Sequence, residues 1–254
     1  MVPLSAVIIT LDEEQNLPGA LASVRFCDEV LVVDWGSSDR TRDIAHGAGA
    51  RVVRGGPWPG FVAGRNAALD LAGHDWVLAL DADERVTPLL RDEIQAERAA
   101  GFRHAGYRVP RVAWYLGRWI RGTDWYPDPQ LRLFDRRRGR WHGSLIHESV
   151  RVQGSVGRLR SDMEHLSYAD VSHHMRVIDS YTTLWARQAF EEGRRAWTLE
   201  PLAASLWAFF RNLVIRHGFL LGETGLTVST LNAYYTYAKL AKLQELALRT
   251  APPP

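Results

Sequence analysis

Short apolar runs alternate with helix-like segments through the first hundred residues. The runs predicted as buried strands are residues 5–10, 29–34, 51–54 and 75–80. Between them, apolar residues recur at helical spacing. Ser38 is expected to cap one helix, and Thr87 followed by Pro88 is typical of another helix start. Because strands that alternate with helices form a mostly parallel sheet covered on both faces, we predict an α/β, Rossmann-like fold.

The pattern becomes helical after residue 170. Three helices are predicted there, at 171–195, 199–219 and 227–247. We therefore expect an α/β domain over residues 1–170 and a helical region over residues 171–254. Charged residues, among them Arg211 and Glu223, interrupt the apolar stretch of this region below the length of a transmembrane helix. Two interpretations stay open: the helices lie on an anionic membrane surface, or they form a dimer interface.

Carboxylates gather just after three of the predicted strands. Asp12, Glu13 and Glu14 follow the first strand, Asp34 closes the second, and Asp81, Asp83 and Glu84 follow the fourth. Ligands of open parallel sheets bind beyond the carboxyl ends of the strands. The three acidic sets are therefore expected to converge on one edge of the sheet, which predicts a binding site there.

The motifs that the chain lacks narrow the kind of site. No GxxxxGK[ST] loop is present and no GxGxxG follows the first strand, so the usual backbone cradles for phosphates are missing. Asp81 and Asp83 instead offer hard oxygen ligands, which suit Mg²⁺ or Mn²⁺ better than zinc. The single cysteine, Cys27, excludes a disulfide scaffold and a Cys-rich zinc site. We predict a diphosphate that is held through a divalent cation.

Charge is distributed unevenly along the chain. The formal net charge is +2, but residues 103–160 contain 13 arginines and only 4 acidic residues. This excess predicts an anionic partner, either a phosphorylated molecule or an anionic membrane. No RNA-binding motif accompanies the arginines, so nucleic acid is not expected. The first apolar run is too short for a signal peptide, and a location in the cytoplasm, peripheral on the inner face of the membrane, is expected.

Several segments together resemble the inverting glycosyltransferases of family 2, which have the GT-A fold. They are IITLDEEQNLPGALASV (8–24), VLVVDWGSSDRT (30–41), GRNAALDLAGHDWVLALDADE (64–84) and the later LRLF, IHES and EHLSY. YPDPQLRLFDRR, RHGFLLGETGL and AYYTYAKLAKL are similar to the bacterial lipopolysaccharide core β-glucosyltransferase subgroup. The resemblance implies transfer of a sugar, expected to be glucose, from a UDP-sugar to an inner-core heptose or a related phosphorylated glycolipid, with Mg²⁺ or Mn²⁺.

The resemblance also implies roles for individual residues. Thr10 and Glu13 would line the nucleoside pocket, Asp34 would contact uracil, Arg65 the nucleotide, Asp81 the ribose or metal, Asp83 the metal, and His165 the metal or diphosphate. Trp35 departs from the family, which usually has Asp, Ser or Asn at this position.

An inverting transfer needs a carboxylate that removes the proton of the acceptor hydroxyl. The resemblance favours Glu148, in the IHES segment 17 residues before His165, with Asp128 as the second candidate. Either carboxylate could instead form a structural ion pair with a nearby arginine. His147 is a candidate ligand or an ordinary loop residue, and His173 and His174 are expected on a helix surface.

Three other functions stay open. One is a family 2 transferase with another cell-envelope or lipid-linked acceptor. A second is a nucleotidyltransferase, which would normally have a Gly-rich basic loop where this chain has LDEEQN. The third is a catalytically silent module that binds a nucleotide or lipid, and a homo-oligomer is compatible with each of them.

Overall fold

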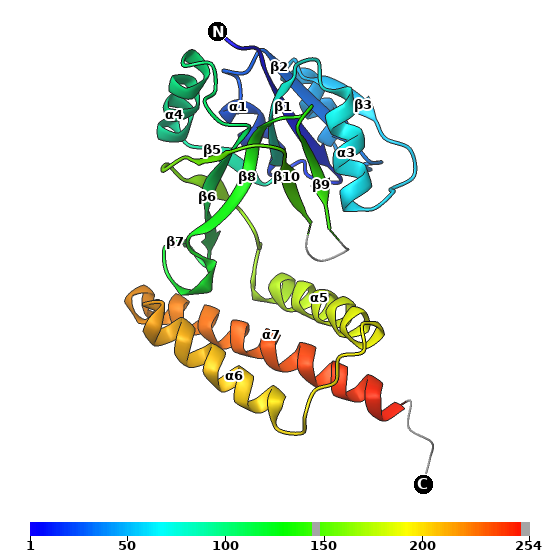
Figure 1. Cartoon of the computed structure of the whole chain (residues 1–254), viewed down its shortest axis with the longest axis vertical. Coiled ribbons are helices and arrows are strands. Elements are labelled where there is room, and N and C mark those ends of the chain that lie inside the picture. Colours follow the sequence, from blue (N-terminus) through cyan, green and yellow to red (C-terminus); the bar gives the residue numbers. More distant parts are fainter. Residues whose placement is uncertain (144–147, 250–254) are drawn as a thin grey trace. The chain divides into compact units, whose positions relative to one another are not determined.

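The computed structural model describes residues 1–143 and 148–249. The chain divides into two compact units, which Figure 1 shows coloured along the sequence. The first unit contains residues 1–112 and 128–166. The second contains residues 113–127 together with the chain from residue 167 onward.

The first unit begins with four parallel strands. β1 (Leu4–Thr10), β2 (Glu29–Asp34), β3 (Arg51–Arg54) and β4 (Trp76–Asp81) lie in the order β3-β2-β1-β4. The helices between and after them are α1 (Leu17–Ser23), α2 (Thr41–Gly47), α3 (Phe61–Leu71) and α4 (Pro88–Ala99). The predicted alternation of strands and helices is confirmed.

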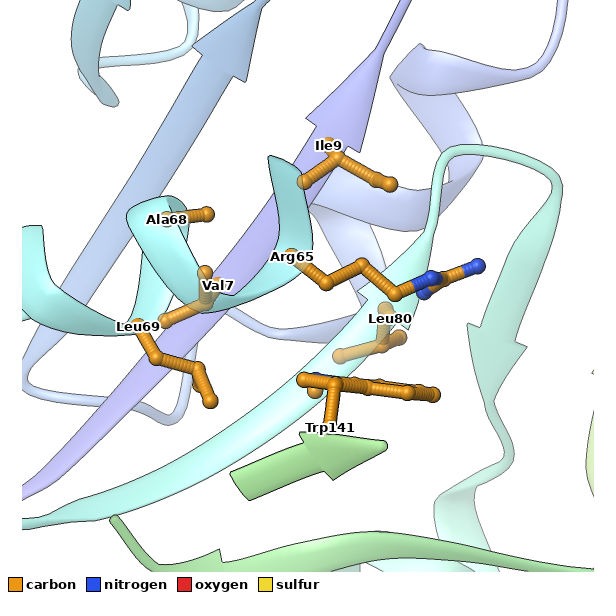
Figure 2. A pocket seen from close by; sticks show the side chains of 8 residues that line it. Val7, Ile9, Arg65, Ala68, Leu69, Leu80 and Trp141 are labelled. Atoms are coloured by element: carbon orange, nitrogen blue, oxygen red, sulfur yellow. The ribbon is translucent and has the colours of Figure 1, made fainter. Parts of the chain in front are cut away.

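Both faces of these strands are buried. Ile8 of β1 lies in a cluster with Leu17 of α1 and Leu90 of α4, whereas its neighbour Val7 lies in a second cluster with Leu69 of α3. Figure 2 shows Val7 and Leu69 together on that second face. Because successive side chains of a strand point to opposite faces, both must be apolar, which explains the continuous apolar runs in the sequence.

The later strands of the unit extend the sheet beyond β4. They are β5 (Glu84–Val86), β6 (Gly106–Tyr115), β8 (Asp128–Asp135), β11 (Val156–Arg158) and β12 (Met163–His165), in the order β4-β8-β6-β12-β5 with β11 beside β6. β9 (Gly139–His142) and β10 (Ser149–Val152) form a separate antiparallel pair. Antiparallel pairing predominates here because no helix separates most of these strands in the chain.

The second unit is mainly helical. It contains β7 (Arg118–Ile120), η1 (Thr123–Trp125), α5 (Val171–Glu191), α6 (Glu200–Phe210), a π-helical turn η2 (Arg211–Ile215), η3 (Gly218–Leu221) and α7 (Gly222–Arg249). Its core joins Tyr115 and Ile120 to Ile178 of α5 and Val228 of α7. This packing assigns residues 113–127 to the helical unit, a division that differs from the expected single boundary after residue 170.

Two local predictions are wrong. Ser38 does not cap α2, whose N-cap is Arg40; the Ser38 backbone N–H and hydroxyl donate to Asp12 instead. His174 is buried rather than on the surface, stacks on Tyr168 with 4.1 Å between ring centroids, and has its pKa lowered to about 4 by burial. The predicted cap of α4 is confirmed, since the Thr87 hydroxyl oxygen accepts a hydrogen bond from the backbone N–H of Leu90 in the first turn of the helix.

Across residues 1–143 and 148–249, no helix combines the length and the apolar character that crossing a bilayer requires.

Candidate active site

The ends of three strands meet at one edge of the sheet. In the β1–β2 ladder Thr10 is paired with Asp34, and in the β1–β4 ladder Ile9 is paired with Asp81. All three strands run in the same direction, so their carboxyl ends lie side by side. The expected convergence of Thr10, Asp34 and Asp81 on one edge is therefore observed.

The acidic loops after β1 and β2 bind each other. Asp12 accepts from Ser38, and the carboxylate of Asp34, which is fully buried, accepts from the backbone of Gly36 and Ser37 at 3.2 Å and from the Ser37 hydroxyl. Asp12 and Asp34 thus hold the two loops in place. The contact of Asp34 with uracil stays a prediction. The Thr10 hydroxyl is also buried here, with no hydrogen-bond partner among the described residues.

Glu13 connects this loop to the turn after β4. Its carboxylate accepts from the Asn16 amide at 2.9 Å. Burial raises the pKa of Glu13, and the negative charges of Asp83 and Asp81 raise it further. Glu13 therefore lies close enough to Asp81 and Asp83 to sense their charge, so the first and third acidic sets form one electrostatic site.

Asp83 and His165 come together although 82 positions separate them in the chain. β12 pairs with β5, which places His165 opposite Glu84, and the backbone N–H of Leu166 donates to the Asp83 carbonyl at 2.9 Å. Asp83 Oδ2 lies 3.2 Å from His165 Nε2. Their side chains are 22% and 18% exposed, so a ligand can reach both.

Asp81, by contrast, is held between two arginines. Its Oδ1 lies 2.6 Å from Arg65 Nη2, and its Oδ2 lies 2.7 Å from Arg132 Nη2. Arg132 also contacts Glu84 at 2.6 Å, and Arg111 contacts Glu84 at 2.9 Å. Acidic and basic groups alternate without interruption along this row, which we call the charge ladder: Glu148, Arg65, Asp81, Arg132, Glu84, Arg111 and Asp128.

The two candidate bases occupy the ends of the charge ladder and differ in how firmly they are held. Asp128 Oδ2 accepts from Arg111 Nη2 at 2.6 Å and Nε at 2.9 Å, and its Oδ1 accepts from Gln130 at 2.6 Å. Glu148 lies 3.7 Å from Arg65 Nη2, an ion pair without hydrogen-bond contact. His147, next to Glu148, lies outside the described residues.

The interior of the charge ladder stays ionised at neutral pH. Burial would raise the pKa of Asp81, but Arg65 and Arg132 outweigh it and hold that pKa well below its usual range. Burial also raises the pKa of Glu84, but the charge of Arg132 lowers it, and the net shift of this pKa is downward. Burial lowers the pKa of Arg132, but Glu84 and Asp81 raise it overall. Each of these charges therefore depends on its neighbours.

The GRN segment of α3 places Arg65 in the charge ladder. Figure 2 shows Arg65 above Trp141, and its guanidinium carbon lies 4.5 Å from that ring's centroid. The next residue, Asn66, exchanges two hydrogen bonds with the Trp141 backbone, at 2.9 and 3.0 Å. Gly64 is required because a Cβ there would lie 2.7 Å from Trp58. Trp58 in turn packs edge-to-face on Trp35, the residue that departs from the family.

Sequence reasoning missed two members of the charge ladder, Arg111 and Arg132, and it missed the role of Glu84 as their partner. One signal was available, since LRLF places an arginine inside an otherwise apolar strand. A buried arginine is rarely found without a partner. Its partners, however, come from β4 and β5, about fifty positions earlier in the chain, and no local pattern identifies them.

The side chains present fit a divalent cation only in part. Asp83 and His165 can each supply one ligand, whereas both oxygens of Asp81 already contact guanidinium groups. No group of three or more His, Cys, Asp or Glu side chains suited to a metal occurs in the part of the chain that the structure describes. Mg²⁺ and Mn²⁺ commonly take few protein ligands and complete their shell with phosphate oxygens and water. Asp83 and His165 therefore suit a cation that binds together with a diphosphate and takes its other ligands from the phosphate oxygens and water.

Replacing Arg132 by methionine is expected to lower the free energy of unfolding by about 3–5 kcal/mol, because Asp81 and Glu84 would then be buried with too little positive charge. Urea denaturation measures this effect. Arg140→Met is the matched control, since Arg140 is 45% exposed and its ion-pair partner Asp70 is 59% exposed. Equal stability of the two variants would show that the charge ladder does not hold the strands together.

Comparisons with known proteins agree with one another. The model of glycosyl transferase family 2 matches residues 5–166. The lipopolysaccharide core biosynthesis glycosyltransferase LpsC of Rhizobium meliloti (strain 1021) is 30% identical, over 99% of this chain and 96% of LpsC. A glycosyltransferase of Rickettsia typhi is 28% identical, over 98% of this chain and 89% of the relative.

One of the similar solved structures is glucosyl-3-phosphoglycerate synthase of Mycobacterium tuberculosis, crystallised with Mn²⁺, UDP and glucosyl-3-phosphoglycerate. It is 24% identical with a TM-score of 0.38, and the match covers 43% of this chain and 44% of that one. Such a partial superposition supports no conclusion about the site.

The chain belongs to the family 2 glycosyltransferases, since the family model covers more than half of it and LpsC matches it over nearly its whole length. It is accordingly a glycosyltransferase with a GT-A-type α/β domain and a C-terminal helical region.

Proposed function

We propose that this enzyme transfers a sugar, expected to be glucose, from a UDP-sugar to the inner-core heptose of lipopolysaccharide or a related phosphorylated glycolipid. The observation that carries the proposal is the pairing of Asp83 with His165 beside Glu13, one turn from the charge ladder that ends at Glu148. The proposed cation ligands, the proposed nucleoside contacts and the candidate base would then lie near one another, joined through the charge ladder.

Donor binding is assigned to the edge formed by β1, β2 and the β4–β5 turn. Thr10, Glu13 and Asp34 lie where a nucleoside would meet the strand ends. Asp83 and His165 would hold Mg²⁺ or Mn²⁺, which, when bound, offsets the negative charge of the diphosphate. Asp81 would act through Arg65 and Arg132, both of which it contacts, and Arg65 would contact the nucleotide.

The transfer itself is a single displacement. The acceptor oxygen attacks the anomeric carbon of the sugar, and the bond from that carbon to the β-phosphate oxygen breaks. Glu148 removes the proton of the acceptor hydroxyl, and UDP leaves with the electron pair of the broken bond. Glu148 suits this role better than Asp128 because, among the residues that the structure describes, its carboxylate contacts Arg65 at 3.7 Å, whereas both oxygens of Asp128 accept short hydrogen bonds.

The acceptor class is proposed from the LpsC relative and from charge. LpsC is named for lipopolysaccharide core biosynthesis. The arginine-rich segment 103–160, apart from Arg111 and Arg132 of the charge ladder, would favour a phosphorylated acceptor and an anionic membrane at the cytoplasmic face. Another cell-envelope acceptor would require the same donor site, so the donor is the part of the proposal to test first.

The test is thermal unfolding with a panel of nucleotide sugars, each with Mn²⁺, with Mg²⁺ or with a chelator. A UDP-sugar at about one hundred times its Kd should stabilise the enzyme by about 2.7 kcal/mol, and only with the cation present. Stabilisation by a GDP-sugar but no UDP-sugar would reject the donor. The absence of any shift across the panel would reject nucleotide-sugar binding altogether.

A further inference from the structure

Large apolar side chains cover the outside of the segment that runs through α6, η2 and η3. We call this surface the outer face; its exposed members are Leu199, Leu202, Leu206, Trp207, Phe210, Val214, Ile215, Phe219 and Leu220. Leu206 is 63% exposed and Leu220 is 69% exposed. Contiguous apolar surfaces of this kind mark an interaction site on proteins that are otherwise soluble.

The inward side of the same segment is mostly small or polar, and Leu221 of η3 is its buried large apolar residue. Its buried members include Ala208, Asn212 and Gly218. Asn212 is fully buried: its amide donates to Asp124 and to the Ala208 carbonyl at 2.8 Å, and its oxygen accepts from Asn232 at 2.7 Å. Hydrogen bonds from a buried side-chain amide therefore tie this segment to its neighbours.

Small residues let the backbones approach closely beside this amide. A Cβ on Gly225 of α7 would lie 1.8 Å from the Gly218 carbonyl oxygen, and a Cβ on Gly218 would lie 2.7 Å from the backbone carbonyl oxygen of Asn212. Ser229, also buried, donates to the Gly225 carbonyl at 2.7 Å. These contacts explain why RHGFLLGETGL carries glycines at both positions.

This arrangement is the reverse of that of a water-soluble amphipathic helix, which buries its large apolar side chains and exposes its polar ones. Helices surrounded by lipid pack through small residues and side-chain hydrogen bonds, with large apolar residues turned outward. We infer that the outer face inserts into the interfacial layer of a membrane. With 11 residues α6 is about 16 Å long, so it lies in the membrane surface rather than across it.

The charges around the outer face indicate an anionic lipid surface. Arg194 and Arg195 precede it, and Arg211 and Arg216 lie within it, after α6. The only charged residue from 196 to 210 is Glu200, which pairs with Arg194 at 3.0 Å. Arg211 and Arg216 contact Asp124 and still expose about half of their side chains. Arginines that border an apolar surface bind the phosphates of lipid headgroups.

A second copy of the chain is the competing occupant of the outer face. The buried Asn212 and the Gly218–Gly225 contact favour lipid, because this segment packs inward largely through small and polar residues, with Leu221 as a buried large apolar exception, while the large apolar side chains of the outer face stay exposed. The inference rests on the proposed function in one respect, that the acceptor is a lipid located in the membrane. The packing of the helical unit supports it independently.

The experiment is co-sedimentation of the full chain with vesicles of phosphatidylcholine and phosphatidylglycerol, without donor or acceptor. The wild-type chain should bind, and Leu206→Glu should weaken binding about tenfold or more. The substitution removes a leucine that would be buried in the lipid and places a charge there. Leu89→Glu is the matched control: Leu89 is 73% exposed on α4 of the other unit, and binding should be unchanged. Circular dichroism of each variant checks that it is folded.

Absence of wild-type binding to these vesicles, or equal binding of Leu206→Glu and wild type, would overturn the inference. A stable dimer in sedimentation velocity that Leu206→Glu dissociates would also overturn it, in favour of a second copy. Because no step involves nucleotide, vesicle binding can succeed where the donor panel fails, and the reverse.

Discussion

Replacing Glu148 by glutamine is expected to lower kcat by about 10²–10⁴ while UDP-sugar binding is retained. The amide keeps the size of the side chain but cannot remove the proton of the acceptor hydroxyl. Glu148 also lies 3.7 Å from Arg65, so the substitution breaks no hydrogen bond of the charge ladder. Initial rates of UDP release give kcat, and nucleotide-dependent thermal shifts show whether the donor still binds.

Asp128→Asn is the matched comparison at the other end of the charge ladder. Its carboxylate is held by Arg111 and Gln130, so its loss should affect the local structure more than the chemical step. We expect a smaller fall in kcat than for Glu148→Gln. The opposite ranking would assign the base to Asp128.

Asp83→Ala is expected to abolish measurable transfer, with kcat/KM reduced by at least about 100-fold, and to remove the cation dependence of UDP binding. Asp83 and His165 are the pair of side chains at this edge that remain accessible to a cation, and alanine leaves His165 alone. Titration of UDP with and without Mn²⁺ measures the effect directly. Near-normal turnover of Asp83→Ala would reject its role as a ligand.

Asp81→Ala provides the contrast within the same motif. Removal of this carboxylate leaves Arg65 and Arg132 buried without their shared partner, so the variant should lose folding stability that Asp83→Ala retains. Urea denaturation of both variants separates a role in the fold from a role at the cation. Equal stability of the two would contradict the different roles assigned to these aspartates.

The parallel part of the sheet could be predicted because its signals are local. Apolar runs, helical spacing and the Thr87 cap each lie within a few residues of one another, and the rule for strand ends then brings Thr10, Asp34 and Asp81 together. Asp83 and His165 were predicted to share a role by resemblance. The antiparallel pairing of β5 with β12 supplies the physical reason for their contact.

The charge ladder could not be predicted because its partners are distant in sequence. Arg132 reads as one arginine in an apolar strand until β8 is placed beside β4. The same holds for residues 113–127, whose Tyr115 and Ile120 pack on α5 and α7. The sequence also showed an apolar stretch in the helical region, but only the structure shows which of its large side chains are exposed on the outer face and which, such as Leu221, Val228 and Leu231, are buried in the core.

UDP release is the measurement that tests the central claim most directly. The enzyme is mixed with UDP-glucose and a deacylated lipopolysaccharide core acceptor, with Mn²⁺ or with a chelator, and free UDP is followed with time. We predict release that requires both the acceptor and the cation and that disappears in Asp83→Ala. Release that is unaffected by the chelator and by Asp83→Ala would contradict the account.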